Sequence, residues 1–388
     1  MKKSIAYITG SRAEYGIVKR LLRSLDNDES IKLHIVVTAM HLDPKYGNTY
    51  RQIEKDGFKI HKSIPINMNN SNNADITASM ADCLQQFGEY FYKEKFDAII
   101  ILGDRYEMMS VAIAAAMHNI PIIHLHGGEK TLGNYDEFIR HSITKMSRLH
   151  LVATEEYRDR VIQLGEHPNT VFNIGALGAE NVTKLQLLSK DELIKNKLLN
   201  ATDKPYFVVV FHPETITGKD ITEQVDELLS ALDYFKEFNF VFIGSNSDTG
   251  SDKIYQMITT FTRERNYKFF TSVSTEEYLS LIKNSCGLIG NSSSGLIEAP
   301  TLKVGTVNIG DRQKGRVRGK TVVDVIAERH SIIEGIAKII SAQFVSALPN
   351  MKNPYFQNEV SENGHRYIKS FLFSNNILVV KDFFDINK

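Results

Sequence analysis

Side chains able to transfer protons are concentrated in one stretch of the chain, between Asp104 and His141. Among its ionisable side chains are Asp104, His124, His126, Glu129, Asp136, Glu137, Arg140 and His141. Such a density of ionisable groups is typical of acid–base sites, in which neighbouring groups adjust each other's pKa. Ion pairs within one helix are the alternative explanation for Asp136, Glu137 and Arg140.

Metal binding is a second alternative for part of this stretch. His124 and His126 are two residues apart in the apolar run 121–126, which we expect to be a strand, so their side chains would share a face. With Asp104 they could bind a metal ion, but no third ligand stands at a diagnostic spacing. We therefore predict no metal site.

A second set of residues has the chemistry to bind phosphate. The segment 290–300 reads Gly-Asn-Ser-Ser-Ser-Gly-Leu-Ile-Glu-Ala-Pro and leads from an apolar run into a helix expected over 294–299. Serine hydroxyls and free backbone N–H groups at a helix N-terminus form an anion site, and a carboxylate one turn later can accept from a ribose diol. A capping box is the alternative. The site would use Asn291, Ser292, Ser293 and Glu298.

Arginines follow three other apolar runs, in Gly10-Ser11-Arg12, Gly103-Asp104-Arg105 and Gly310-Asp311-Arg312. A guanidinium grips phosphate with a planar fork and keeps its charge at any physiological pH. A surface ion pair would explain each arginine alone. Three arginines in equivalent places instead predict the binding of an anionic ligand by Arg12, Arg105 and Arg312.

The elements that must position these residues alternate along the chain. Apolar β-prone runs are followed by polar turns and then by helical spacing, first over 3–164 and again from 206. This order predicts the α/β class, with two Rossmann-like, doubly wound parallel sheets. Ligands of such sheets bind beyond the carboxyl ends of the strands, so we expect an active-site cleft between the two domains. We place the domains at 1–178 and 179–360, with a tail over 361–388 that returns to the first domain.

Composition limits the classes of function. The chain has 388 residues, with 46 basic and 46 acidic side chains, so no nucleic-acid partner is expected. Near-zero net charge favours self-association, as a homodimer or homotetramer. Two cysteines far apart indicate a reducing, cytoplasmic location, and the apolar segment 111–125 is too interrupted to span a membrane. The motifs of P-loop NTPases and of nicotinamide-binding domains are absent.

The residues above, in this order and spacing, resemble the hydrolysing UDP-N-acetylglucosamine (UDP-GlcNAc) 2-epimerases of bacterial sialic-acid and capsule biosynthesis. The resemblance runs through essentially the whole chain. It is carried by Thr9-Gly-Ser-Arg-Ala-Glu-Tyr-Gly16, Met40-His41, Tyr46-Gly-Asn-Thr49, Leu102-Gly-Asp-Arg105, Gly127-Gly-Glu129, Ile139-Arg-His-Ser-Ile-Thr-Lys145, Phe211-His-Pro213, Gly290-Asn-Ser-Ser293 and Glu298-Ala-Pro300.

The resemblance implies a glycosyltransferase-B-like fold around a nucleotide-sugar cleft. It implies that UDP-GlcNAc and water give N-acetylmannosamine (ManNAc) and UDP without a cofactor. Anti elimination of UDP would leave 2-acetamidoglucal, to which water then adds. By the same resemblance Asp104 and Asp136 would be the principal acid–base carboxylates, supported by Glu129 and Arg140, and His212 would face the leaving group or the sugar. UDP would be held by Arg12, Arg105, Asn291, Ser292, Ser293, Glu298 and Arg312.

The chain departs from the family pattern at His126, where many relatives have a glutamate before the Gly-Gly pair. Either His126 or Glu129 would take over proton transfer, and a histidine suits a base near neutral pH. The spacing between Gly127-Gly-Glu129 and Arg140-His-Ser142 is one residue longer than in the family pattern, so the role of Asp136 could fall to Glu137. Tyr278 is the only aromatic we suggest for uracil stacking. Turnover of another sugar nucleotide (a UDP-2,4-diacetamido-trideoxyhexose or GDP-GlcNAc), glycosyl transfer, and non-catalytic sensing remain alternatives.

Overall fold

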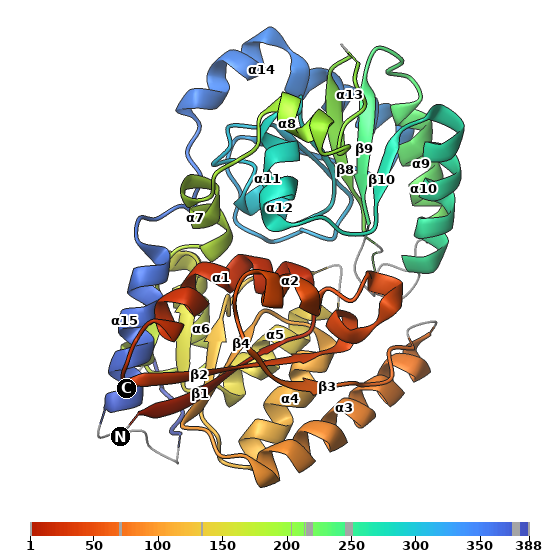
Figure 1. Ribbon diagram of the computed structural model, residues 1–388. Helices are drawn as coiled ribbons and strands as arrows, with labels where there is room; N and C mark the ends of the chain where they lie inside the picture. The colour runs from red at the N-terminus through yellow and green to blue at the C-terminus, as the bar shows by residue number, and fades with distance from the viewer. Residues whose placement is uncertain are drawn as a thin grey trace. The chain divides into compact units, whose positions relative to one another are not determined.

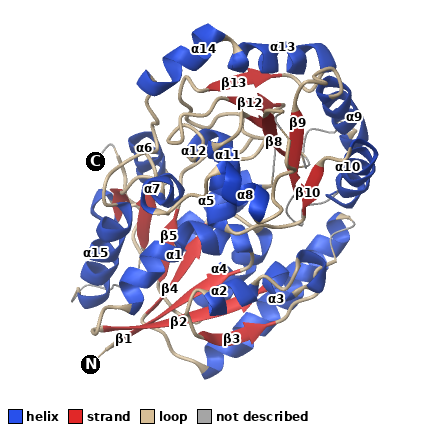
Figure 2. Cartoon of the chain, turned by 45° about the horizontal axis from the view of Figure 1, so that its top comes forward, coloured by secondary structure: helices blue, strands red, loops and turns tan. Residues whose placement is uncertain are grey.

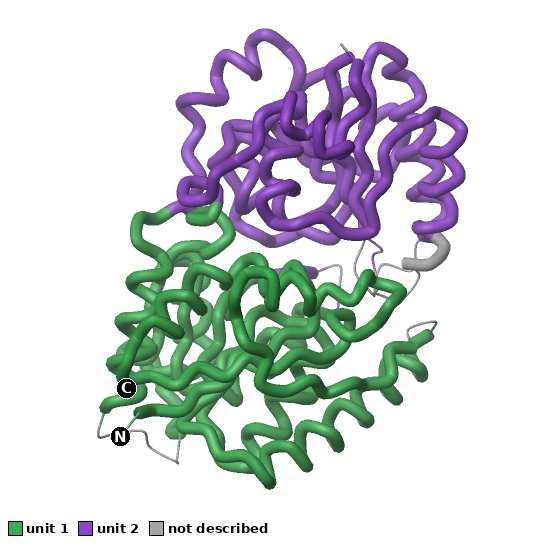
Figure 3. Tube along the Cα trace, in the orientation of Figure 1, with its two compact units in different colours: residues 1–129, 136–181, 357–388 green, residues 130–135, 182–356 purple. Residues whose placement is uncertain are grey.

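The computed structural model (Figure 1) describes residues 2–69, 72–132, 135–202, 204–212, 214, 220–244, 251–374 and 381–386. Strands and helices alternate in these ranges (Figure 2). The chain forms two compact units (Figure 3), with residues 1–129, 136–181 and 357–388 in unit 1 and residues 130–135 and 182–356 in unit 2. We expected domain boundaries at 178/179 and 360/361. In the structure the chain passes from one unit to the other at 181/182 and at 356/357. Nothing in the sequence indicated that 130–135 belongs with unit 2.

Unit 1 contains a parallel sheet whose seven strands, among the described residues, follow the order β3-β2-β1-β4-β5-β6-β7. The doubly wound α/β topology that we predicted is therefore present. The strands are β1 (Lys3–Thr9), β2 (Ile31–Thr38), β3 (Ile60–Ile64), β4 (Ala98–Leu102), β5 (Ile122–Leu125), β6 (Leu149–Val152) and β7 (Val171–Asn173). The helices are α1 (Arg12–Asp26), α2 (Tyr50–Lys55), α3 (Asn73–Lys93), α4 (Tyr106–Met117), α5 (Asp136–Met146), α6 (Glu155–Gln163), α15 (Val360–Phe373) and α7 (Leu177–Lys184), whose last three residues belong to unit 2.

Unit 2 contains a second parallel sheet, which in the described part of the chain has six strands in the order β10-β9-β8-β11-β12-β13. These are β8 (Tyr206–Val210), β9 (Asn239–Ile243), β10 (Lys268–Phe270), β11 (Leu288–Gly290), β12 (Thr306–Ile309) and β13 (Val322–Val325). The helices are α8 (Lys190–Lys195), α9 (Ile221–Leu232), α10 (Ser251–Arg265), α11 (Thr275–Lys283), α12 (Ser294–Ile297), α13 (Arg329–Ile340) and α14 (Ala342–Ala347). Short 3₁₀ turns cover Ala39–Leu42, Pro44–Tyr46, Pro168–Thr170 and Leu348–Asn350.

The central strands are buried because both faces of each sheet are covered. All five residues of β4, the apolar sequence Ala-Ile-Ile-Ile-Leu, are buried, as are all five of β8. Strands of parallel sheets read as continuous apolar runs for this reason. Their carboxyl ends then deliver the next residues, which include Asp104 after β4 and His212 after β8, to the same edge of each sheet.

The C-terminal helix α15 packs in unit 1 beside α1. Ser24 Oγ lies 2.8 Å from His365 Nδ1, and Asp28 Oδ2 accepts from His365 Nε2 at 2.8 Å. The rings of Phe172 and Tyr367 stack with centroids 4.0 Å apart. Among the described residues no single helix has the length and apolar content to cross a membrane, although the bent pair Arg329–Ile340 and Ala342–Asn350 meets that criterion by length and composition.

Candidate active site

Four side chains at the strand-end edge of unit 1 form one continuous polar chain. His126 Nδ1 lies 2.9 Å from Glu129 Oε1, and Arg140 Nη1 donates to Glu129 Oε2 at 3.1 Å. The other terminal nitrogen of Arg140 contacts Asp104 Oδ2. Glu129 and Arg140 are almost fully buried, so each charge depends on its partners rather than on water. The structure thus brings together four of the residues that the sequence nominated.

Backbone geometry after β5 explains how His126 reaches this network. The strand ends at Leu125, and His126 has a φ of 62°, a left-handed conformation that costs free energy for a residue with a side chain. Gly128 has a φ of 78°, and a Cβ there would lie 2.5 Å from the carbonyl oxygen of Tyr157. The turn therefore requires a glycine at 128, and it places Glu129 back beside the ring of His126.

The tautomer of His126 follows from its partner. The Glu129 carboxylate can only accept, so Nδ1 carries a proton, and in the neutral ring Nε2 keeps the lone pair. Nε2 is buried and has no hydrogen-bond partner among the described residues. Both oxygens of Glu129 are engaged, by His126 and by Arg140. His126 therefore has the free basic nitrogen, and Glu129 orients it.

His124 has a different role from the one expected of it. Its Nε2 lies 2.8 Å from the Gly103 carbonyl oxygen, and its Nδ1 lies 3.1 Å from Thr144 Oγ1. Burial lowers the pKa of His124 to about 3, so the ring is neutral and its role is structural. The expectation that His124 and His126 share a strand face is wrong, because His126 lies beyond the end of β5. No group of three or more His, Cys, Asp or Glu residues in the described chain could hold a metal ion.

The first turn of α5 contains two acidic residues, Asp136 and Glu137. Asp136 is the first residue of the helix and is half-buried. Glu137 Oε1 lies 3.4 Å from His141 Nε2, one turn further along the helix. Arg140 instead leaves the helix surface for Asp104 and Glu129. The alternative of a purely helical ion-pair cluster therefore does not account for Arg140.

A pair of buried carboxyl groups beside this network was missed in the sequence. Glu107 is fully buried and accepts from Arg105 Nε at 2.5 Å, and Glu14 accepts from the N–H groups of Gly10 and Ser11 at 2.8 Å. Burial, reinforced by the charge of Glu107, raises the pKa of Glu14 to about 7. The pair holds Arg105 at the end of β4. Arg12 is the first residue of α1 and is half-buried.

The strand-end edge of unit 2 is organised by Asn291. Its side chain accepts from the His212 N–H at 2.7 Å and donates to the His212 carbonyl oxygen at 2.9 Å. Its own carbonyl oxygen accepts from Gln313 Nε2 at 2.8 Å and lies 3.5 Å from Arg312 Nη1. Gly290, with a φ of 133°, must be glycine because a Cβ would lie 1.9 Å from the Val210 carbonyl oxygen.

The serine segment differs from the expected helix start. The expected helix 294–299 is a single turn, α12, because Glu298 already ends it. Within the described chain Ser293 makes no capping hydrogen bond, so no capping box is centred on it, and Ser292 Oγ accepts from the Ser294 N–H at 3.4 Å instead. Ser292 and Ser293 are half-buried at the end of β11, and Glu298 and Arg312 are buried. Tyr278 is half-buried on α11. Pro213 lies outside the described residues.

Glu214, to which the sequence analysis gave no role, also organises this edge. Its Oε1 accepts from the Asp311 N–H at 2.8 Å, and a Cβ at Gly310 would lie 2.3 Å from that oxygen. The Gly-Asp-Arg turn after β12 is therefore fixed by a carboxylate that follows β8. Sequence spacing carries no signal for such a contact between segments about 100 residues apart.

Comparison with solved structures identifies the fold of this chain. The UDP-GlcNAc 2-epimerase of Methanocaldococcus jannaschii, solved in complex with UDP-GlcNAc and UDP, superposes with a TM-score of 0.78 at 17% identity, over 94% of this chain and 99% of that one. The enzyme of Neisseria meningitidis bound to UDP-GlcNAc gives 0.77 at 16% identity, over 95% and 100%. The fold is thus that of the glycosyltransferase-B-like epimerases, as predicted.

Sequence comparison places the chain within that class. The family model described as UDP-N-acetylglucosamine 2-epimerase matches residues 23–369. The polysialic acid biosynthesis protein P7 of Escherichia coli is 55% identical over 385 residues, which cover 99% of this chain and 98% of that protein. The hydrolysing GDP/UDP-N,N'-diacetylbacillosamine 2-epimerase of Campylobacter jejuni is 38% identical over 88% of this chain and 89% of its own. The chain belongs to the UDP-N-acetylglucosamine 2-epimerase family.

Proposed function

We propose that the protein is a hydrolysing UDP-GlcNAc 2-epimerase that converts UDP-GlcNAc and water into ManNAc and UDP and supplies ManNAc for sialic-acid synthesis. The observation that carries the proposal is the buried Nε2 of His126, which has no partner in the described structure and is oriented by Glu129. The 55% identity to a polysialic acid biosynthesis protein supports the proposed pathway.

The first half-reaction needs a base for the poorly acidic C2 proton. In our proposal His126 Nε2 takes this proton while the C1–O bond breaks and its electron pair leaves with UDP. The product of this anti elimination is 2-acetamidoglucal. Glu129 stabilises the imidazolium that forms, in the way a buried carboxylate holds the histidine of a catalytic triad.

The second half-reaction returns a proton to C2 from the opposite face and adds water oxygen at C1. We assign the carboxyl groups of Asp104 and Asp136 to these proton transfers, with Arg140 holding Asp104 in place. The pyranose then carries the inverted C2 configuration and a hydroxyl at C1, which is ManNAc. Every proton taken from the sugar and from water is returned to the sugar or released with UDP.

We assign UDP to the arginines and hydroxyls at the strand ends. Arg312, Ser292, Ser293, Asn291 and Glu298 of unit 2 would bind the nucleotide, and His212 would face the leaving group or the sugar. Arg12 and Arg105 would act on the same substrate molecule. Arginine suits this role because its charge and fork geometry match a diphosphate.

The test is a product analysis after incubation with UDP-GlcNAc alone. Equal amounts of free UDP and ManNAc are expected without any acceptor. UDP-ManNAc, with the nucleotide still attached, would contradict hydrolysis, and UDP release that depends on an acceptor would indicate a glycosyltransferase. Binding without turnover would indicate a sensor.

A second candidate keeps the mechanism and changes the sugar. It is favoured by the 38% identity to the hydrolysing diacetylbacillosamine epimerase of Campylobacter jejuni. The assay should therefore be repeated with UDP-2,4-diacetamido-trideoxyhexose and with GDP-GlcNAc. Fast turnover of either, with none of UDP-GlcNAc, would replace the first proposal.

A further inference from the structure

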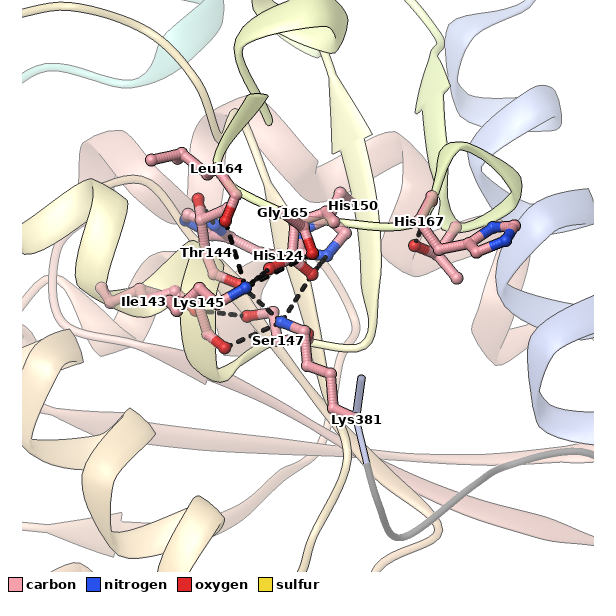
Figure 4. Close-up of polar contacts among 12 residues, drawn as sticks. His124, Ile143, Thr144, Lys145, Ser147, His150, Leu164, Gly165, His167 and Lys381 are labelled. Atoms are coloured by element: carbon pink, nitrogen blue, oxygen red, sulfur yellow. Dashed lines mark hydrogen bonds and ion pairs between the residues drawn. The ribbon is translucent and has the colours of Figure 1, made fainter. Parts of the chain in front are cut away.

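The C-terminal segment 381–386 ends in contact with the far end of α5 in unit 1. Lys381 Nζ donates to the carbonyl oxygens of Lys145 and Ser147 at 2.7 Å and lies 3.4 Å from that of Thr144 (Figure 4). The last carbonyl groups of a helix have no partner within the helix and carry its negative partial charge. A lysine ammonium is therefore well suited to hold this end.

A buried carboxylate fixes the ammonium in that position. Glu166 Oε2 lies 2.5 Å from Lys381 Nζ and 2.9 Å from His150 Nε2, and Oε1 lies 2.9 Å from Lys145 Nζ. Glu166 is 1% exposed. Burial alone would raise the pKa of Glu166, but the hydrogen bonds from His150, Lys381 and Lys145 lower it to about 2. Burial lowers the pKa of Lys381 to about 8, against the pull of Glu166.

Two aromatic residues of the segment 381–386, Phe383 and Phe384, also pack against unit 1. The Phe384 N–H donates to the Gly165 carbonyl oxygen at 2.9 Å, and its ring meets His167 edge-on at 5.1 Å. A Cβ at Gly165 would lie 2.3 Å from the ring of Phe383, so the glycine leaves room for that ring. Lys145 Nζ lies 4.6 Å from the Phe383 ring centroid. The segment is thus bound by side chains as well as by Lys381.

The C-terminal end of α5, which Lys381 contacts, is connected by two routes to the polar chain of Asp104, Arg140, Glu129 and His126. Arg140 lies one turn before Thr144 on the same helix and contacts Asp104 and Glu129. Thr144 Oγ1 also meets His124, whose other nitrogen meets the Gly103 carbonyl oxygen directly before Asp104. A shift of α5 along its axis would therefore move both sides of the Arg140–Asp104 contact.

We propose that Lys381 is a positioning residue for the reaction. It fixes the position of α5, so that Arg140 on this helix keeps its contacts with Asp104 and Glu129. This inference rests on the proposed function for its catalytic readout. Lys381 touches no reacting atom. Its effect is expected in kcat rather than in substrate binding, because misplacement of catalytic groups by about 1 Å is enough to cost around 100-fold in rate.

The experiment compares Lys381→Met and Lys381→Arg with Lys369→Met. Lys369 is a matched control because it pairs with Asp28 on the surface of unit 1, also near the C-terminus. Lys381→Met should lower kcat about tenfold or more at unchanged KM, by the same misplacement argument. Lys381→Arg should recover most of the rate, and Lys369→Met should match the wild type. Wild-type kcat in Lys381→Met, or no rescue by arginine, would overturn the proposal.

Two further readouts separate positioning from simple destabilisation and from failure of the proposed function. In the wild type, kcat should fall above pH of about 8 as Lys381 loses its proton beside Glu166, Lys145, His150 and Arg148, and Lys381→Arg should lack this fall. Hydrogen exchange needs no substrate. Lys381→Met should speed exchange in 136–146 and 101–105 but not in 12–26. Faster exchange confined to 381–386, or spread evenly through unit 1, would contradict positioning even if UDP-GlcNAc is not turned over.

Discussion

Glu129 Oε1 lies 2.9 Å from Nδ1 of His126, while Nε2 of the same ring has no hydrogen-bond partner in the described part of the chain. The family resemblance left open whether His126 or Glu129 replaces the missing glutamate. Under the proposed function the contacts favour His126 as the base and Glu129 as its support, because both oxygens of Glu129 are engaged and Nε2 of His126 is not. His126 follows the strand in a left-handed backbone conformation that costs free energy, as is common at functional sites, and this agrees with the role proposed for it.

Replacement of His126 by alanine should remove the base. Since general base catalysis contributes about 10²–10⁴-fold, we expect kcat to fall by that factor. UDP affinity, measured by calorimetry, should stay near that of the wild type. Activity that survives with an unaltered pH profile would show that His126 is a bystander.

Asp104→Asn should abolish turnover while leaving UDP binding nearly intact. The amide cannot carry a proton between substrate and solvent, and it also loses the charge that Arg140 faces. Turnover and UDP affinity are measured on the same preparation. Asp26→Asn, the same substitution at an exposed carboxylate at the end of α1, is the matched control. Equal losses in both variants would refute a specific role for Asp104.

Loss of a hydroxyl or a guanidinium at the edge of unit 2 should weaken nucleotide binding. Ser293→Ala or Arg312→Ala is expected to cost roughly 1–3 kcal/mol of UDP binding if a charge-assisted bond is lost. The effect should appear in KM and in UDP affinity, with kcat at saturation changed less. Unchanged UDP affinity in both variants would place the diphosphate elsewhere.

The buried Glu14 predicts an unusual dependence of stability on pH. Its pKa is about 7 in the folded protein, because of burial and the charge of Glu107, against 4.5 as the ordinary value. The folded state therefore binds the proton more tightly, and stability is lost as pH rises from about 4.5 through 7. The loss is on the order of 3 kcal/mol for a shift of this size.

Glu14→Gln removes this titration. The melting temperature of the variant, relative to the wild type, should rise between pH 5 and pH 8. The control substitution is Glu29→Gln, at an exposed glutamate. No such rise in relative melting temperature between pH 5 and pH 8 is expected for it. A variant that loses stability equally at both pH values would show that Glu14 is not protonated in the folded state.

Much of the fold could be predicted because its central strands are apolar on both faces. The apolar run 98–102, for example, forms the central strand β4, and all five of its residues are buried. Two edge strands, β3 and β13, escaped prediction for the converse reason. In β3 the sequence Ile-His-Lys-Ser-Ile has three exposed residues in its middle, and β13 is only partly buried. Neither has the continuous apolar pattern that marks a strand.

The candidate site was predictable where its residues follow strands, as Asp104, Glu129 and Arg312 do or nearly do. Contacts between distant segments were not predictable. Glu107 beside Glu14, Glu214 beside Asp311 and Lys381 beside Glu166 are joined only by the fold. Each is a carboxylate whose partner lies tens to hundreds of residues away. A single sequence records such partners only as separate charged residues.

The central claim is tested most directly by proton NMR of the protein with UDP-GlcNAc in D₂O, without added metal. The account predicts that UDP and ManNAc appear together and that the ManNAc carries deuterium at C2. Deuterium is required there because a base removes the C2 proton and solvent supplies its replacement. ManNAc that retains the original proton at C2, or UDP-GlcNAc that survives intact, would contradict it.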